Sequence, residues 1–397
     1  MAAKLNSMFV HTPVKKGTCA DCHNPHASAH GKLLSASPAE LCRTCHAKII
    51  PEKAISGHKV VVEGNCVKCH DPHASNNKAN LLKTGHELCV SCHKALGDTI
   101  AKVAFKHMPV STDCMGCHNP HASDKASDLL KSPVPALCIQ CHKPDSPRFK
   151  QQHVNYPVAR ANCVSCHDPH GSNVAGILFD TVHAPVASKR CNQCHDAATA
   201  DKPFATRRAG FELCRGCHST MMNETFSKNR IHWPLVDRTG CLSCHEPHAA
   251  RQKKLLKVAG AELCGQCHRD TIERQVKLGE KAAQEKAATA GRVRVEKGAL
   301  AHEPVQGGSC LACHQPHASD SAGLMRQASV VEGCGACHDW LKHNSHPMGE
   351  KYRDMRNKNL AVDCLSCHKA HGTGYRHMIT FPTPTELCVQ CHKQLRR

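Results

Sequence analysis

The stretch CADCHNPHAS at residues 19–28 decides the fold, and its core is the string C-x-x-C-H. This string recurs fifteen times along the 397 residues and uses all 30 cysteines. The cysteine pairs are Cys19 and Cys22, Cys42 and Cys45, Cys66 and Cys69, Cys89 and Cys92, Cys114 and Cys117, Cys138 and Cys141, Cys163 and Cys166, Cys191 and Cys194, Cys214 and Cys217, Cys241 and Cys244, Cys264 and Cys267, Cys310 and Cys313, Cys334 and Cys337, Cys364 and Cys367, and Cys388 and Cys391. No cysteine is left over, so one chemistry has to explain the whole set.

Three kinds of site use paired cysteines. A disulfide scaffold explains an even number of cysteines but not the histidine that follows every pair. Zinc sites built from C-x-x-C units leave these adjacent histidines without a role. Attachment of haem c requires two thiols and one axial imidazole within a short turn, and every string supplies all three groups. The sequence therefore predicts fifteen covalent haem c groups.

Each string also supplies the proximal iron ligand of its own haem. These ligands are His23, His46, His70, His93, His118, His142, His167, His195, His218, His245, His268, His314, His338, His368 and His392.

The composition indicates how such a chain folds. Each haem has only about 26 residues of polypeptide (397/15), and aromatic residues make up 3% of the chain, so the porphyrins have to serve as the apolar core. We expect a mostly irregular chain with short α-helices and little or no sheet. The predicted architecture is an elongated, repeat-like multihaem c-type cytochrome whose core is a stacked haem array. No apolar run is long enough for a transmembrane helix.

The strings alternate between two types, which suggests how the chain is divided. Seven A strings are followed by x-P-H, or by K-A-H at Cys364, and eight B strings often follow Glu-Leu. The extra B string is that of Cys191. We expect haem pairs in residues 1–53, 54–101, 102–148, 223–269, 300–341 and 342–397, a haem triplet in 149–222, and a charged helical spacer in 270–299.

A second set of histidines recurs at fixed places and is expected to supply the distal iron ligands. Seven follow the A strings: His26, His73, His121, His170, His248, His317 and His371. Others precede the A strings: His11, His58, His107, His153, His232, His302 and either His343 or His346, of which we place His346 in the ligand set. His183 serves the triplet, and His30, His86 and His377 have no assigned role. The sequence leaves open which distal histidine serves which haem. The simplest scheme pairs each upstream histidine with its own A haem and each x-P-H histidine with a B haem.

Two imidazoles saturate an iron, so these haems are expected to be low-spin and closed to substrates. The chain is then an electron carrier rather than an enzyme. Its formal charge of +19 does not indicate nucleic-acid binding. A ferric bis-histidine haem carries about one net negative charge, and fifteen of them would lower +19 to about +4.

The doubled strings C-x-x-C-H-x-P-H and L-C-x-x-C-H resemble the paired-motif multihaem cytochromes. That family includes the periplasmic pentahaem donors of nitrite reductase and the decahaem cytochromes of porin–cytochrome conduits. The resemblance implies a haem wire that links periplasmic donors to outer-membrane or extracellular acceptors. Its partners would be other redox proteins and an outer-membrane β-barrel porin. A subunit that stacks end to end into an extracellular cytochrome filament is the alternative, and a reductase with one open iron is a third.

Haem attachment takes place outside the cytoplasm, so the chain is expected to be exported to the periplasm, the outer membrane or the cell exterior. The sequence MAAKLNSMFVHTP lacks the apolar segment of a signal peptide. We therefore expect that the numbering starts after a removed leader.

Overall fold

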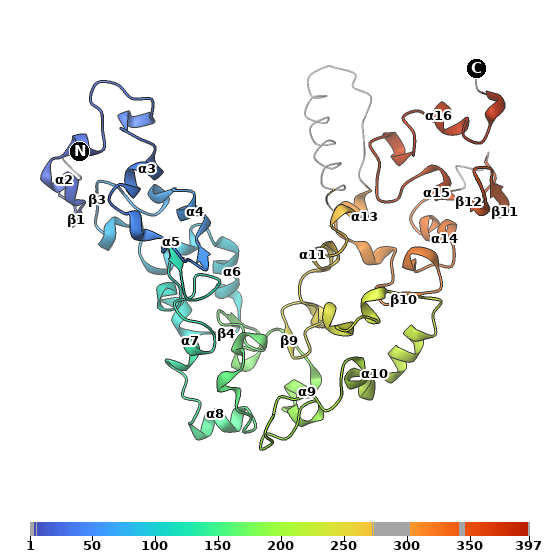
Figure 1. Ribbon diagram of the computed structural model, residues 1–397, viewed down its shortest axis with the longest axis horizontal. Coiled ribbons are helices and arrows are strands. Elements are labelled where there is room, and N and C mark those ends of the chain that lie inside the picture. The colour runs from blue at the N-terminus through green and yellow to red at the C-terminus, as the bar shows by residue number, and fades with distance from the viewer. Residues whose placement is uncertain (1–3, 5, 272, 274–301, 341–345, 396–397) are drawn as a thin grey trace. The chain divides into compact units, whose positions relative to one another are not determined.

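The computed structural model describes residues 4, 6–271, 273, 302–340 and 346–395 (Figure 1). The chain divides into two compact units. The first comprises residues 1–205 with 248–250, and the second comprises 206–247 with 251–397. The predicted spacer at 270–299 lies outside the described residues except for 270, 271 and 273.

The first unit contains short helices and two-residue strands. Its helices are α2 (Thr12–Lys16), α3 (Pro38–Arg43), α4 (Lys59–Val62), α5 (Gly85–Val90), α6 (Lys94–Lys102), α7 (Ala136–Ile139), α8 (Pro147–Gln152) and α9 (Ala184–Ala187). Its strands are β1 (Phe9–Val10), β2 (Ser56–Gly57), β3 (Ala74–Ser75), β4 (Phe105–Lys106), β5 (Ala122–Ser123), β6 (Gly171–Ser172), β7 (Thr181–Val182) and β9 (Ala249–Ala250).

The second unit follows the same pattern with one longer helix and one hairpin. Its helices are α10 (Phe211–Phe226), α11 (Gly260–Gly265), α13 (Glu303–Gln306), α14 (Val330–Gly335), α15 (Cys364–Cys367) and α16 (Pro384–Cys388). Its strands are β8 (Arg230–Ile231), β10 (Ala318–Ser319), β11 (Gly349–Asp354) and β12 (Asn357–Val362).

The Glu-Leu that precedes many B strings has a local structural role. In α3, Ser37 is the N-cap residue and Glu40 is the third helical residue, and the two close a capping box. Thr383 and Glu386 do the same at the start of α16. A capping box pairs the orphan amides at a helix start, so the glutamate stabilises the first turn of the short helix that carries the first cysteine of the B string.

In the part of the chain that the structure describes, five small antiparallel sheets join one repeat to the next. They pair β1 with β3, β2 with β5, β4 with β6, β7 with β9, and β8 with β10. In each sheet, one strand is formed by the two residues before an upstream histidine. The other strand is formed by the two residues that follow the x-P-H string of the next repeat, as when Val10 pairs with Ala74. We call this contact between consecutive repeats the tandem joint.

The described residues form almost no conventional core. The buried apolar residues are Ala74, Ile100, Val103, Ala122, Tyr156, Met222, Ala249, Ala250 and Ile379, and no large side chain in this part of the chain is fully buried. The chain exposes 27509 Å². A globular monomer of 43.2 kDa would expose about 15,000 Å². The prediction of a mostly irregular chain with short helices and little sheet is confirmed.

Candidate haem-binding sites

The attachment strings of type A share one geometry. The first three residues form a 3-10 turn in strings such as that of Cys19, and the histidine follows directly. Its Nδ1 lies 2.7–3.0 Å from a backbone carbonyl nine or ten residues further on. The pairs are His23 with Lys32, His70 with Ala79, His118 with Asp128, His167 with Gly176, His195 with Phe204, His245 with Lys254, His314 with Gly323, and His368 with His377. A ligand histidine that donates from Nδ1 presents the lone pair of Nε2 to a metal.

A strained turn positions these carbonyls. At the first repeat, Lys32 and Leu33 both have left-handed backbone angles, with φ of 60° and 55°. Ala79 and Asn80 repeat this with 57° and 55°. Non-glycine residues adopt this region only at an energetic cost. The turn directs the carbonyl of its first left-handed residue, Lys32 or Ala79, toward the Nδ1 of the string's histidine.

The Cys191 string belongs to type A, so the expected assignment to type B is wrong. His195 makes the same contact as the histidines of the other A strings, because its Nδ1 lies 3.0 Å from the carbonyl oxygen of Phe204. The residues after His195 are Asp-Ala-Ala instead of x-P-H. The string was therefore predicted to be of type B. The strings in 149–222 thus form one single A string at Cys163 and one A–B pair at Cys191 and Cys214.

The histidine rings meet in pairs across the repeats. The pairs are His11 with His46 (6.2 Å between centroids), His23 with His73 (6.1 Å), His58 with His93 (6.0 Å), His70 with His121 (6.1 Å), His107 with His142 (6.0 Å), His118 with His170 (6.2 Å), His153 with His167 (6.2 Å), His195 with His248 (5.9 Å), His232 with His268 (6.2 Å), His245 with His317 (6.2 Å), His302 with His338 (6.0 Å), His314 with His371 (5.9 Å) and His346 with His392 (6.3 Å). A metal held between two imidazoles by bonds of about 2.0 Å separates the ring centroids by about 6.3 Å. The residues therefore fit bis-histidine haem.

The pairing follows a rule that differs from the simplest scheme. An upstream histidine faces the B string of its own repeat, as His11 faces His46. An x-P-H histidine faces the A string of the preceding repeat, as His73 faces His23. Among the described pairs, His153 alone faces the A string that follows it. The tandem joint explains the rule, because it brings each x-P-H string against the previous repeat.

Three predicted ligands need separate mention. His346 faces His392, which supports the choice of His346 over His343 for this string; His343 lies outside the described residues. His183 donates its backbone amide to the carbonyl of His248 at 2.9 Å, and its role as an iron ligand stays a prediction. His26 is exposed, and within the described residues no ring lies against it.

The upstream histidines are oriented by a second carbonyl. Their Nδ1 atoms lie 2.9 Å from the carbonyl oxygen of the proline in the x-P-H string of the following repeat. These pairs are His11 with Pro72, His58 with Pro120, His107 with Pro169, and His232 with Pro316. The sequence signalled the proline as a turn residue, but it did not reveal that the proline carbonyl is the acceptor. The upstream imidazole of such a pair therefore has Nδ1 occupied and Nε2 available.

Burial keeps several of these imidazoles neutral. Desolvation lowers the pKa of His73, His121, His167 and His317 below the usual histidine value. A neutral imidazole is the form that binds a metal. The sites are thus prepared for ligation at neutral pH.

The thiols of consecutive strings lie side by side. The first cysteine of a B string lies close enough to the first cysteine of the following A string for the second thiol to raise the pKa of the first, as Cys66 does for Cys42 and Cys114 does for Cys89. Burial, followed by the neighbouring Cys66, raises the pKa of the Cys42 thiol to about 11. Within a repeat, the second cysteines are close enough to interact, as Cys22 and Cys45 do. Along the chain, a contact between second cysteines within a repeat therefore alternates with a contact between first cysteines of neighbouring repeats.

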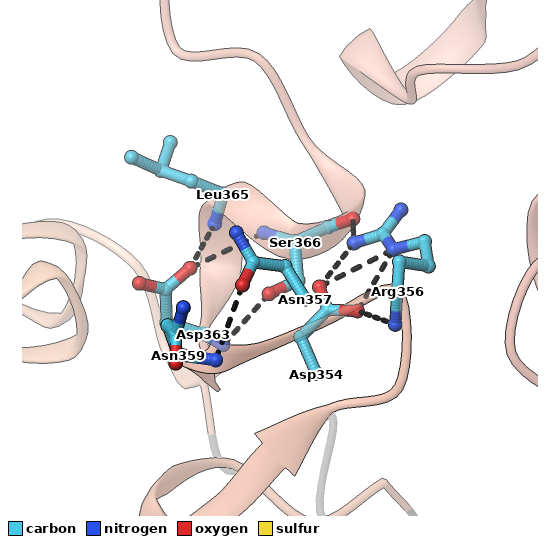
Figure 2. A network of polar contacts seen from close by, with 7 residues as sticks. All are labelled: Asp354, Arg356, Asn357, Asn359, Asp363, Leu365 and Ser366. Carbon is cyan, nitrogen blue, oxygen red and sulfur yellow. Dashed lines mark hydrogen bonds and ion pairs between the residues drawn. The ribbon is translucent and has the colours of Figure 1, made fainter.

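A hairpin is tied to the Cys364 string by a polar network, shown in Figure 2. Strands β11 and β12 enclose Asp354, which is 4% exposed. Arg356 donates to its carboxylate from Nε at 2.9 Å and from Nη2 at 2.5 Å. The same Nη2 donates to the carbonyl of Ser366 at 2.6 Å, inside the attachment string. The Arg356 guanidinium lowers the pKa of Asp354 to about 2.

Replacing Asp354 with Asn is expected to detach this hairpin from the string. The change removes the charge that orients Arg356 and costs about 1–3 kcal/mol of local stability. Hydrogen exchange of the amides in residues 349–362 should accelerate by about tenfold or more, because exchange follows local opening. Arg353→Gln removes a charge from the exposed side of the same hairpin and is the control. Equal exchange in both variants would contradict the role of the network.

Acid should also break the polar network of Asp354, Arg356 and Ser366. The pKa of Asp354 is depressed in the folded state, so its contribution to stability is present above its unfolded value near 3.8 and is lost as the pH falls toward about 2. The Asp354→Asn variant should lack this acid transition, which amide exchange at pH 2–4 measures. Persistence of the transition in that variant would assign it to other carboxylates.

None of the described helices is long and apolar enough to cross a membrane. None of the 30 cysteines is joined to another in a disulfide in the structure.

The comparisons with known proteins agree with this geometry. The family described as the doubled CXXCH motif matches residues 11–50, 58–98, 107–147, 155–182, 183–223, 232–273, 302–343 and 357–397. Over 93 residues, the chain is 32% identical to the multiheme cytochrome MtrA of Shewanella baltica (strain OS185), a region that is 22% of this chain and 25% of MtrA. Because the family match extends over most of the sequence, this chain belongs to the doubled-CXXCH family and is a multihaem c-type cytochrome whose C-x-x-C-H strings bind haem c.

Proposed function

We propose that this cytochrome holds fifteen low-spin haems and conducts electrons between periplasmic donors and acceptors at the outer membrane or outside the cell. The observation that carries the proposal is the recurrent pairing of imidazole rings at 5.9–6.3 Å. Haem supplies a one-electron iron couple when bound. The paired imidazoles of the chain would hold each iron from both sides, and this would leave no position for a substrate.

The ligand set of the proposal differs in one respect from the sequence prediction. Thirteen distal histidines face a proximal ring in the structure, and His183 stays assigned to the Cys191–Cys214 pair. His218 and His368 are proximal ligands by virtue of their strings, and their distal partners stay predictions. His26 faces no imidazole ring within the described residues, and its role as a distal ligand stays a prediction.

The side-by-side thiols support conduction rather than isolated redox centres. Consecutive strings attach their haems through neighbouring cysteines, such as Cys138 and Cys163 or Cys264 and Cys310. Such attachment would hold consecutive haems close together in a fixed order. The haem pairs expected in 1–53, 54–101, 102–148, 223–269, 300–341 and 342–397 are the repeating elements of this proposed wire.

Partners and location follow from the resemblance to conduit cytochromes. We infer that the chain is exported and exchanges electrons with other cytochromes, and that an outer-membrane porin is the structure that would house it. The excess of lysine and arginine, which gives +19 before haem is counted, balances the haem propionates.

The proposal is tested by ligand binding and electron counting on the purified holoprotein. Coulometry should give about fifteen electrons per chain, one for each C-x-x-C-H string. Carbon monoxide should leave the spectrum of the reduced protein unchanged, and oxidised samples should show low-spin iron throughout. Stoichiometric carbon monoxide binding in the unmodified protein would instead support the reductase alternative.

A further inference from the structure

In four ligand pairs, a proline carbonyl holds the two imidazole planes nearly parallel. The upstream histidine of each pair donates from Nδ1 to a proline of the following repeat. A hydrogen bond from Nδ1 fixes how a ligand imidazole is rotated about its bond to the metal. The rings are inclined to each other by 18–24° in the pairs His11 with His46, His58 with His93, His107 with His142, and His232 with His268.

The pair of His153 and His167 is built differently, and its rings are inclined by 63°. The Nδ1 of His153 lies 2.9 Å from the carbonyl oxygen of Phe149, one turn earlier in the chain. The ring of Phe149 packs against the imidazole, with 4.3 Å between the ring centroids. His167 makes the usual contact of an A string, with its Nδ1 2.8 Å from the carbonyl of Gly176. The inclination therefore arises on the side of His153.

The backbone around His153 is fixed on both sides. Helix α8 is capped by the hydroxyl of Ser146, which accepts the amide of Phe149 at 3.3 Å. After the helix, the amide of Tyr156 donates to the carbonyl of His153 at 3.0 Å. Tyr156 is 8% exposed, and its hydroxyl donates to the carbonyl of Asp196 at 2.5 Å. These contacts hold the imidazole in the inclined orientation.

The angle between two axial imidazoles affects the electrons of a low-spin haem iron. Parallel rings donate π electrons to the same iron d orbital, which separates this orbital in energy from its partner and stabilises the ferric state. Crossed rings donate to both orbitals, so the two energies stay close and this stabilisation is lost. A crossed haem is therefore reduced at a higher potential than a parallel one. In electron paramagnetic resonance, its ferric form gives one strongly shifted line, here called the low-field signal, instead of three well-resolved lines.

We propose that Phe149 is a positioning residue that turns the ring of His153 across that of His167, and that the haem of the Cys163 string is therefore reduced before its neighbours. This requires both imidazoles on one iron and thus rests on the proposed function. The redox step moves one electron from a neighbouring ferrous haem, which is oxidised, to the ferric haem of this string. No bond forms or breaks. Second-shell contacts are among the means by which a protein tunes a haem.

The strings on both sides of Cys163 supply the contrast. The haem of the Cys138 string would lie between His142 and His107, whose rings are inclined by 24°. The haem of the Cys191 string would lie between His195 and His248, whose rings are inclined by 36°. Both pairs are closer to parallel than the pair of His153. Electrons that enter the array should therefore collect first at the Cys163 haem.

The first test is electron paramagnetic resonance of the oxidised holoprotein and its variants. Phe149→Ala leaves the ring of His153 free to rotate, and the low-field signal should decrease by about one haem per chain. Phe149→Tyr keeps an aromatic ring against His153 and should keep the whole signal. Phe226→Ala is the matched control, because it removes a phenylalanine that packs against Phe211 instead of a ligand. It should leave the signal unchanged.

A redox titration of the unmodified protein, followed by the same spectra, is an independent measurement. The low-field signal should disappear at a higher potential than the three-line signals of the parallel pairs. The rings of His346 and His392 are inclined by 82° and should contribute to the low-field signal as well. Their share should survive in Phe149→Ala, whereas the Cys163 haem should then titrate in the range of its neighbours.

The proposal is overturned if the unmodified protein lacks the low-field signal, or if that signal disappears at the lowest potentials. It is also overturned if Phe149→Ala keeps the whole signal. Carbon monoxide binding by Phe149→Ala would show that Phe149 holds the ligand on the iron instead of turning its ring, and would contradict the proposal too. High-spin iron in the unmodified protein would contradict the proposed function instead. Low-spin iron with three-line spectra alone would leave the conduit intact and remove only the crossed pair.

Discussion

A chain made without covalent haem is expected to be unfolded. We expect its far-ultraviolet circular dichroism to lack the helical signal and its radius of gyration to approach about 70 Å, the value for an unfolded chain of this length. The reason is the scarcity of buried apolar groups, which are nine residues in the described part of the chain, four of them alanines. Such a core cannot offset the conformational entropy lost on folding.

The matched control for this experiment is the same polypeptide matured with haem during export. It should be compact and resistant to protease, because the porphyrins cover surfaces that the chain alone leaves exposed. Small metal-dependent domains behave in this way when their ion is withheld. A sharp, cooperative thermal transition in the haem-free chain would contradict the idea that haem forms the core.

Replacing His73 with Ala is expected to open one iron to external ligands. The His73 ring lies 6.1 Å from that of His23 and is parallel to it within 8°, which is the arrangement of two axial ligands on one haem. Removing it should leave the haem at Cys19 and Cys22 five-coordinate or water-bound. Carbon monoxide uptake should rise from none to about one per chain, with a matching high-spin fraction in the oxidised protein.

Two controls give this prediction its specificity. His30→Ala should bind no carbon monoxide, since His30 takes part in no ring pair in the described residues. His73→Met should restore a low-spin iron and raise the potential of that one haem, because a thioether favours the reduced state. If His73→Ala takes up no carbon monoxide and stays fully low-spin, the assignment of His73 to the Cys19 haem is wrong.

Some structural features were predictable from the sequence because they depend on neighbouring residues alone. The C-x-x-C-H strings adopt short turns or helices, and the Glu of the Glu-Leu motif closes a capping box at Glu40 and at Glu386. The fold class followed from composition, since so few apolar residues cannot form a core. Thirteen of the fifteen histidines predicted as distal ligands face a proximal ring in the structure, and they could be picked out because their positions repeat; the roles of His26 and His183 stay predictions.

The partners of these histidines could not be read from the sequence. The scheme that paired His11 with its own A string failed because the tandem joint brings His11 to the B histidine, His46, and brings His73 from the next repeat to His23. The Cys191 string was misclassified because its turn toward Phe204 needs no x-P-H. Both errors concern contacts between residues that are far apart along the chain.

The sequence alone thus determined which atoms bind haem covalently and how many strings do so, because thioether attachment needs only five consecutive residues. The tertiary structure decided which imidazoles face each other, since this depends on the two-residue strands and the proline carbonyls that join consecutive repeats. It also showed that the Nδ1 of His153 is held by the carbonyl of Phe149 instead of by a proline of another repeat. Haem attachment is encoded in short motifs, whereas the pairing of imidazoles from different repeats depends on the backbone contacts between those repeats.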